Sequence, residues 1–173
     1  MIKRSDIQKI INEYTDLRIG VLGSHSALEI MDGAKDENFE TIVFCQKGRE
    51  TPYQRFSRIA NEIKVLKKFS DMSSIKNQKM LRDTNTLVVP HRSLTAYLGY
   101  KTIENSFKVP IFGNRALFQA EERNNKKNQY YLLRKAGLKH PKIFKNPKDI
   151  NRPSIVKVQE KKRKLERAFF TVS

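Results

Sequence analysis

Short apolar runs alternate with amphipathic segments along the first two thirds of the chain. Runs of this kind, bounded by polar or turn-forming residues, are typical of buried strands. The runs that predict strands lie at residues 18–22, 41–45, 62–66, 86–89 and 109–112. Strands that are apolar on both faces belong to parallel sheets covered by helices on both sides. We therefore predict an open, doubly wound parallel sheet of the Rossmann-like α/β class over about residues 15–115.

Segments with apolar residues at helical spacing separate these runs. Ser5 has the side chain of a helix N-cap and precedes an amphipathic pattern that continues to about Tyr14. The other segments with helical spacing are residues 26–35, 74–83 and 94–98. Helices that alternate with strands in this way predict a βαβ arrangement.

The last third of the chain has a different pattern. A long polar segment from Ala116 to Lys135 predicts a helix, which Gly137 would end. Two apolar runs, at residues 154–158 and 168–172, then predict strands on either side of a basic stretch. The sequence therefore predicts one domain at residues 1–115, followed by a linker helix and the first strands of a second domain at 116–173.

Composition narrows the class of protein. Hydrophobic residues make up 38% of the 173 residues, which is enough for a folded core. The single cysteine, Cys45, excludes an internal disulfide and an all-cysteine metal site, and its apolar surroundings favour a buried, inert thiol. No run of 18 apolar residues and no secretory leader pattern is present, so we expect a cytoplasmic protein.

The net charge of +17 is concentrated in the last third. Residues 1–120 carry 19 Lys+Arg against 13 Asp+Glu, whereas residues 121–173 carry 16 against 5. A basic surface of this kind can bind nucleic acid, or it can serve small anionic ligands. Charge alone leaves both alternatives open.

Three loops follow predicted strands on the side of a parallel sheet where ligands bind. The first, from Gly23 to Ser26, holds Ser24 and His25 at the mouth of a helix, a setting that suits a phosphate or another small anion. An ordinary turn with Ser24 or Ser26 as N-cap is the structural alternative. The second loop carries Lys47 and Arg49, which would suit a phosphorylated substrate, although composition alone favours a solvated basic loop.

The third loop repeats the pattern of the first, because His91 and Ser93 follow a strand. The two loops could face each other across a crevice. A serine hydrolase is disfavoured, since the chain has no Gly-x-Ser-x-Gly elbow. A zinc site built from His25, His91 and His140 is also disfavoured, because no pair has a metal-ligand spacing.

Taken together, these loops resemble the archaeal PurP family. The motifs in register, which cover nearly the whole chain, are Leu22-Gly23-Ser24-His25-Ser26, Lys47-Gly48-Arg49 with Pro52-Tyr53 and Arg55-Phe56, Val88-Val89-Pro90-His91 with Ser93, Glu104-Asn105-Ser106, Val109-Pro110-Ile111-Phe112-Gly113-Asn114-Arg115 and Leu133-Arg134-Lys135-Ala136-Gly137-Leu138 followed by Pro141. The resemblance implies a Rossmann-like domain followed by an ATP-grasp domain. It also implies a ligase that formylates aminoimidazole carboxamide ribonucleotide (AICAR) with formate and ATP.

The resemblance also implies the site. The AICAR-contacting histidine and serine of the family fall on His25 and Ser93, and Ser24, Lys47 and Arg49 are further candidates for phosphate contacts. Lys157 is a candidate nucleotide contact. ATP and magnesium are the implied cofactors, and we expect the magnesium carboxylates to lie outside this chain, which alone would then be inactive.

The sequence departs from the family pattern at two places. A basic stretch replaces the glycine-rich loop after Lys157, which removes the close backbone approach that glycine allows. Arg92 stands between His91 and Ser93 where the family has a small residue. Two alternatives therefore stay open: a non-catalytic nucleotide-binding paralogue and a basic nucleic-acid-binding protein. We expect small-molecule partners and no membrane, disfavour nucleic acid, and leave a homo-oligomer open.

Overall fold

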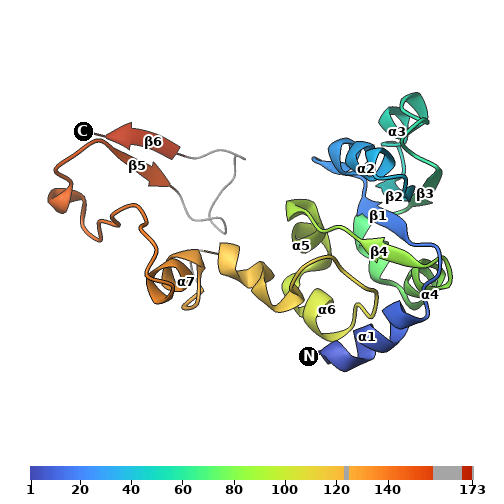
Figure 1. The fold of residues 1–173 in the computed structure, drawn as a ribbon. Coiled ribbons are helices and arrows are strands. Elements are labelled where there is room, and N and C mark those ends of the chain that lie inside the picture. The colour runs from blue at the N-terminus through green and yellow to red at the C-terminus, as the bar shows by residue number, and fades with distance from the viewer. Residues whose placement is uncertain (123–124, 158–168, 173) are drawn as a thin grey trace. The chain divides into compact units, whose positions relative to one another are not determined.

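The computed structural model describes residues 1–122, 125–157 and 169–172 (Figure 1). The chain divides into two compact units, Met1–Ala116 and Leu117–Ser173. Within the described residues no helix is both long enough and apolar enough to cross a membrane.

The first unit is built on a four-stranded parallel sheet. Its strands are β1 (Arg18–Leu22), β2 (Glu40–Gln46), β3 (Glu62–Leu66) and β4 (Thr86–Val88), in the order β3-β2-β1-β4. The register pairs Leu22 with Phe44, so β1 and β2 end together at the carboxyl edge. The predicted Rossmann-like parallel sheet is confirmed.

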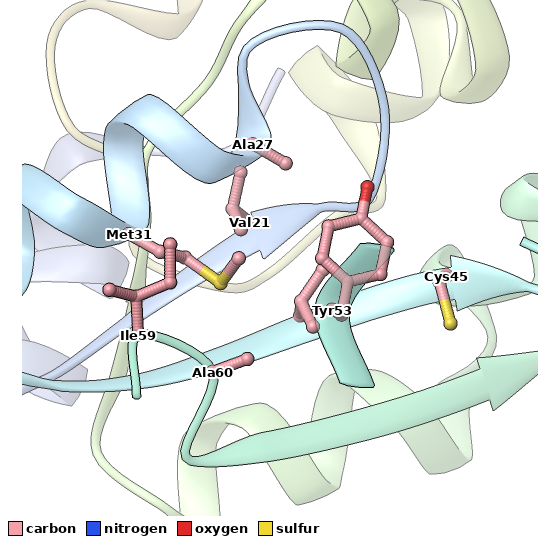
Figure 2. Packing of buried hydrophobic residues seen from close by; sticks show 8 residues of the cluster. Val21, Ala27, Met31, Cys45, Tyr53, Ile59 and Ala60 are labelled. Carbon is pink, nitrogen blue, oxygen red and sulfur yellow. The ribbon is translucent and has the colours of Figure 1, made fainter. Parts of the chain in front are cut away.

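Helices cover both faces of this sheet. On one face, Val21 and Val43 pack in a cluster with residues of α2 (Ala27–Asp36) and α3 (Thr51–Arg55), as Figure 2 shows. On the other face lies α4 (Ile75–Asp83): a Cβ on Gly20 would stand 3.6 Å from the side chain of Leu81. The residues along β2 from Thr41 to Cys45 are buried, as their unbroken apolar pattern predicts.

The remaining elements of this unit are α1 (Arg4–Asn12), the 3₁₀ helix η1 (Phe69–Ser73), α5 (Arg92–Leu98) and α6 (Tyr100–Asn105). The prediction that Ser5 caps the first helix is wrong. The helix already begins at Arg4, with Lys3 in extended conformation at the N-cap position and no side-chain cap. Ser5 therefore lies inside the first turn.

The predicted strand at residues 109–112 is only an isolated parallel bridge between Val88 and Ile111. Pro110 has no N–H to donate to a ladder. The carbonyl of Val109 accepts instead from the guanidinium of Arg115, at 2.8 Å. The same guanidinium donates to the carbonyls of Ile103 and Phe107, so it joins the end of α6 to this segment.

The second unit begins with two short helices in place of the single long helix predicted for residues 116–135. A 3₁₀ helix, η2, spans Arg115–Glu121, and α7 spans Gln129–Lys135. The side chain of Asn128 accepts from the N–H of Tyr131 and so starts α7 as a new helix. This local capping bond is the reason that the prediction is wrong.

The rest of the second unit follows the sequence pattern. Gly137, at φ 68°, lies just past α7, and the N–H groups of Gly137 and Leu138 donate to the carbonyls of Arg134 and Leu133. This pair of hydrogen bonds ends the helix, as predicted. The 3₁₀ helix η3 (Pro147–Asp149) and the antiparallel pair β5 (Ser154–Lys157) and β6 (Phe169–Val172) complete the unit. The basic stretch between these strands lies outside the described residues.

Candidate functional site

The strand order creates a topological switch point between β1 and β4. From β1 the chain adds β2 and then β3 on one side, and β4 is placed on the other side of β1. The connections that leave the carboxyl ends of β1 and β4 therefore diverge (Figure 1). Open α/β sheets bind ligands in the crevice at this point.

Two hydrogen bonds join the loops that follow β1 and β4. The Ser93 hydroxyl donates to the Ser24 hydroxyl at 3.1 Å, and the His91 ring bonds through Nε2 to the carbonyl of Leu22 at 2.8 Å. His25 is the neighbour of Ser24; it is exposed, and its Nδ1 lies 3.1 Å from the Ser26 hydroxyl. The structure thus brings Ser24, His25 and Ser93 to the same edge of the sheet. Their role as ligand contacts stays a prediction.

The loop after β1 approaches β2 so closely that a side chain at its first residue, Gly23, would crowd β2. The N–H of Gly23 donates to the carbonyl of Phe44 at 2.7 Å. A Cβ on Gly23 would lie 3.0 Å from the Cβ and 3.1 Å from the Cα of Cys45. The loop is therefore held by backbone contact, which fixes the position of the hydroxyl and imidazole groups that follow.

The first turn of α2 has backbone N–H groups that donate to no described residue. Ser26 occupies the N-cap position, but its side chain makes no capping hydrogen bond. Among the hydrogen bonds of the described residues, none uses the N–H groups of Leu28 and Glu29 in the first turn. Such donors, together with the positive end of the helix dipole, favour a bound anion. The carboxylate of Glu29 is exposed and opposes this charge in part.

His91 has a structural role that the sequence did not reveal. Its Nδ1 accepts from the N–H of Ser93 at 3.3 Å, which makes it the N-cap of α5, and its Nε2–H donates to Leu22. Both ring nitrogens are therefore used in the neutral form. Burial lowers the pKa of His91, the nearby His25 lowers it further, and the Leu22 carbonyl and Glu29 act in the opposite direction.

The loop after β2 presents a cation at the same edge. Gly48, at φ 86°, donates its N–H to the carboxylate of Glu50 at 2.9 Å and so forms a tight turn. The guanidinium of Arg49 lies 5.6 Å above the ring of Phe69 in η1, a cation–π contact. That ring in turn lies 4.5 Å from the ring of Tyr97, on the helix that carries Ser93. The side chain of Lys47 is exposed to solvent.

Two further residues from the sequence analysis are Arg92, the first residue of α5, and Lys157, in the second unit. Arg92 donates to the hydroxyl of Tyr100 in α6 at 2.9 Å. Lys157 is the last residue of β5, and its side chain lies outside the described part of the chain. No group of three or more metal-ligating side chains occurs among the described residues, so these residues fit neither a zinc nor a magnesium site.

Comparisons with known proteins show the family to which the chain belongs. A family model described as "Protein of unknown function (DUF1246)" matches residues 19–144. The chain is 47% identical over 159 residues to the 5-formaminoimidazole-4-carboxamide-1-(beta)-D-ribofuranosyl 5'-monophosphate synthetase of Methanopyrus kandleri, a match that covers 91% of this chain and 44% of the relative. The synthetase of the same name from Methanocaldococcus jannaschii is 42% identical, with 91% and 43% covered.

A solved structure is also similar to this chain. The fold is similar to the crystal structure of an IMP biosynthesis protein PurP from Thermococcus kodakaraensis, with a TM-score of 0.61 and 31% identity, over 79% of this chain and 42% of that one. The chain thus spans less than half the length of the relatives that it matches. The chain belongs to the family that the DUF1246 model describes, the family of the PurP-type synthetases to which it is similar.

Proposed function

We propose that this chain is the AICAR-binding part of a ligase of purine synthesis that formylates AICAR with formate and ATP. The observation that carries the proposal is the hydrogen bond between the hydroxyls of Ser24 and Ser93 at the switch point between β1 and β4. It joins the two loops that present His25 and Ser93, on the edge where such sheets bind nucleotides. The name of the Methanopyrus kandleri relative, a synthetase of the formamido ribonucleotide, supports the reaction.

The chemistry of the loops suits a ribonucleotide monophosphate. The free N–H groups at the start of α2 would bind the phosphate, and the hydroxyls of Ser24 and Ser93 and the imidazole of His25 would bind and orient the remainder of AICAR. Arg49 and Lys47 would add positive charge from the loop after β2. The role of the chain in this proposal is to hold the amine of AICAR in position.

The complete reaction joins formate to that amine. Formate takes the terminal phosphoryl group of ATP to give formyl phosphate and ADP; the AICAR amine then attacks the formyl carbon and releases phosphate. ATP would contact Lys157. Because the described residues do not fit a magnesium site, we assign no step of phosphoryl transfer to them.

Calorimetric titration of the 173-residue chain tests the proposal. AICAR should bind, and its dephosphorylated riboside should bind far more weakly, because the phosphate supplies the charge that the start of α2 favours. His25→Ala should weaken AICAR binding by about 1–3 kcal/mol if the imidazole hydrogen-bonds the ligand. His140→Ala is the matched control, since His140 lies in the second unit, where its ring bonds to the carbonyl of Pro141 and contacts the ring of Tyr130 edge-on.

The same titration separates the proposed function from one of the two alternatives, the nucleic-acid-binding protein. A nucleic-acid-binding protein would bind polyanions with a steep dependence on salt and would not distinguish AICAR from other nucleotides. A non-catalytic paralogue would bind AICAR as the ligase does. Equal affinity for AICAR and its riboside, or an unchanged affinity in His25→Ala, would contradict the proposed site.

An ADP-release assay tests whether this chain binds AICAR without catalysing the reaction. With formate, ATP, AICAR and magnesium present, the 173-residue chain should show no AICAR-dependent turnover, because the described residues hold no group that could bind magnesium between the ATP phosphates. Turnover above background would contradict this expectation.

A further inference from the structure

Tyr53 is a buried tyrosine whose hydroxyl makes no hydrogen bond with any described residue. The residue is 5% exposed and belongs to the core cluster that fills the face of the sheet under α2 and α3. Its backbone N–H donates to the carbonyl of Glu50, yet no hydrogen bond of its hydroxyl occurs among the described residues. A buried hydroxyl without a partner is unfavourable, and native proteins rarely tolerate one without a reason.

The position of Tyr53 connects this hydroxyl to the site. Figure 2 shows the hydroxyl pointing away from the sheet, toward the loop that leads from β1 into α2. The ring packs in one cluster with Val21, just before that loop, and with Ala27, the first residue of α2. The hydroxyl thus points toward the loop that holds Ser24 and His25, and this loop leads into the uncapped start of α2.

The surroundings keep the hydroxyl in the form that donates. Burial raises the pKa of Tyr53 to about 12, an effect that the nearby Cys45 thiol increases and the Arg49 cation opposes. At neutral pH the group is therefore a protonated phenol. A phenol next to a cation and a helix start with free N–H groups is suited to donate to an anion and not to act as a base.

We propose that the Tyr53 hydroxyl donates a hydrogen bond to the phosphate of the ribonucleotide bound at the start of α2. This inference rests on the proposed function, and it adds to the site a residue from α3, a third element of the sheet edge. The bound phosphate supplies the acceptor that the hydroxyl lacks in the free protein. Tyr53 would thereby distinguish phosphorylated from unphosphorylated ligands.

Tyr53→Phe gives a test with two readouts of opposite sign. The variant keeps the ring that packs on Val21 and Ala27 and removes only the unpartnered oxygen. The melting temperature of the ligand-free chain should therefore rise, by about 5 °C. The affinity for AICAR should fall about 10-fold or more, because a hydrogen bond to a charged group is lost. The affinity for the riboside should not change.

Tyr14→Phe is the matched control. Tyr14 is also a partly buried tyrosine with a pKa raised to about 12 by burial, but its hydroxyl has a partner, the carbonyl of Thr86 at 3.5 Å. Thr86 begins β4, so this hydroxyl lies at the opposite, amino edge of the sheet. Tyr14→Phe should leave AICAR binding unchanged and should not raise the melting temperature.

The outcomes separate this inference from the proposed function. If the wild-type chain binds AICAR and Tyr53→Phe binds it equally well, the hydroxyl does not contact the ligand and the inference is overturned while the proposed function stands. A fall in the melting temperature of Tyr53→Phe would also overturn it, because it would reveal a stabilising partner of the hydroxyl in the free protein. If the wild-type chain binds neither AICAR nor inorganic phosphate, the proposed function fails first, and the inference fails with it.

Discussion

Replacement of His91 by alanine should destabilise the first unit, although His91 stands next to a site proposed to bind a ligand. The ring joins the loops after β1 and β4, since Nε2–H donates to the Leu22 carbonyl at 2.8 Å and Nδ1 accepts from the N–H of Ser93 at 3.3 Å. His91→Ala removes both bonds at once. The Leu22 carbonyl, in a fully buried residue, then loses its donor from the loop after β4.

The size of the effect follows from these two bonds. The Leu22 carbonyl keeps a second donor, the N–H of Ser24 at 2.8 Å, so loss of the His91 bond costs about 1 kcal/mol, and loss of a helix N-cap also costs about 1 kcal/mol. Because one ring makes both bonds, the costs are not fully additive, and we expect about 2 kcal/mol or slightly less. For a unit of this size that lowers the melting temperature by about 7 °C. His91→Asn should lose less, about 1 kcal/mol, because asparagine is itself a good N-cap.

Urea unfolding followed by circular dichroism measures these differences. His25→Ala is the internal control: His25 is exposed and, within the described part of the chain, its ring hydrogen-bonds only to the neighbouring Ser26, so its loss should change the stability by about 0.5 kcal/mol or less. Replacement of His91 should thus lower the stability, whereas replacement of His25 should lower the affinity for the ligand. A His91→Ala variant as stable as the wild type would refute the structural role of the ring.

Three other predictions concern the same unit. Burial lowers the pKa of His91 in the folded state, so the folded state binds fewer protons than the unfolded state. The free energy of unfolding should therefore be at its full value above pH 6.5 and should decline as the pH falls through the folded pKa. A His91→Asn variant in the same pH series should lack this decline. Gly23→Ala should destabilise the chain by about 1–3 kcal/mol in urea unfolding, because its Cβ would press on the backbone of Cys45, and a melting curve that matches the wild type would contradict the close approach. Arg115→Lys should lower the melting temperature although it keeps the charge, since a lysine ammonium cannot match the three carbonyl contacts of the guanidinium, and calorimetric unfolding that shows no loss would argue against this anchor.

The sheet was predictable from the sequence because its signals are local. Each strand is an unbroken apolar run, and the predicted bounds of residues 18–22 and 62–66 agree with β1 and β3. The segment at residues 109–112 has the same apolar character, but Pro110 and the contacts of Arg115 leave it with one bridge. Apolar character indicates burial; it does not show whether the backbone donors are available.

The prediction of one long helix after residue 115 was wrong for a related reason. Residues 116–135 have a polar, helix-compatible composition, and nothing in the periodicity separates η2 from α7. The side chain of Asn128 makes the division by capping the N–H of Tyr131. Asparagine can cap a helix or lie inside one, and the difference depends on a single hydrogen bond.

The candidate site was predictable only in part. A histidine and a serine after two separate strands indicated two ligand-side loops, and the strand order brings these loops to one edge. The role of His91 and the burial of Tyr53 could not be predicted, because they depend on contacts with β1 and α2, which come much earlier in the chain. Side chains that are placed by long-range packing are the part of a site that sequence patterns do not indicate.

A crystal structure of the 173-residue chain with AICAR tests the central claim most directly. We predict the ligand in the crevice between the loops after β1 and β4, with its phosphate within about 3 Å of the N–H groups at the start of α2 and of the Tyr53 hydroxyl. His25 and Ser93 should contact the remainder of the molecule. AICAR bound to the basic second unit, or a crevice that stays empty at saturating ligand, would contradict the account.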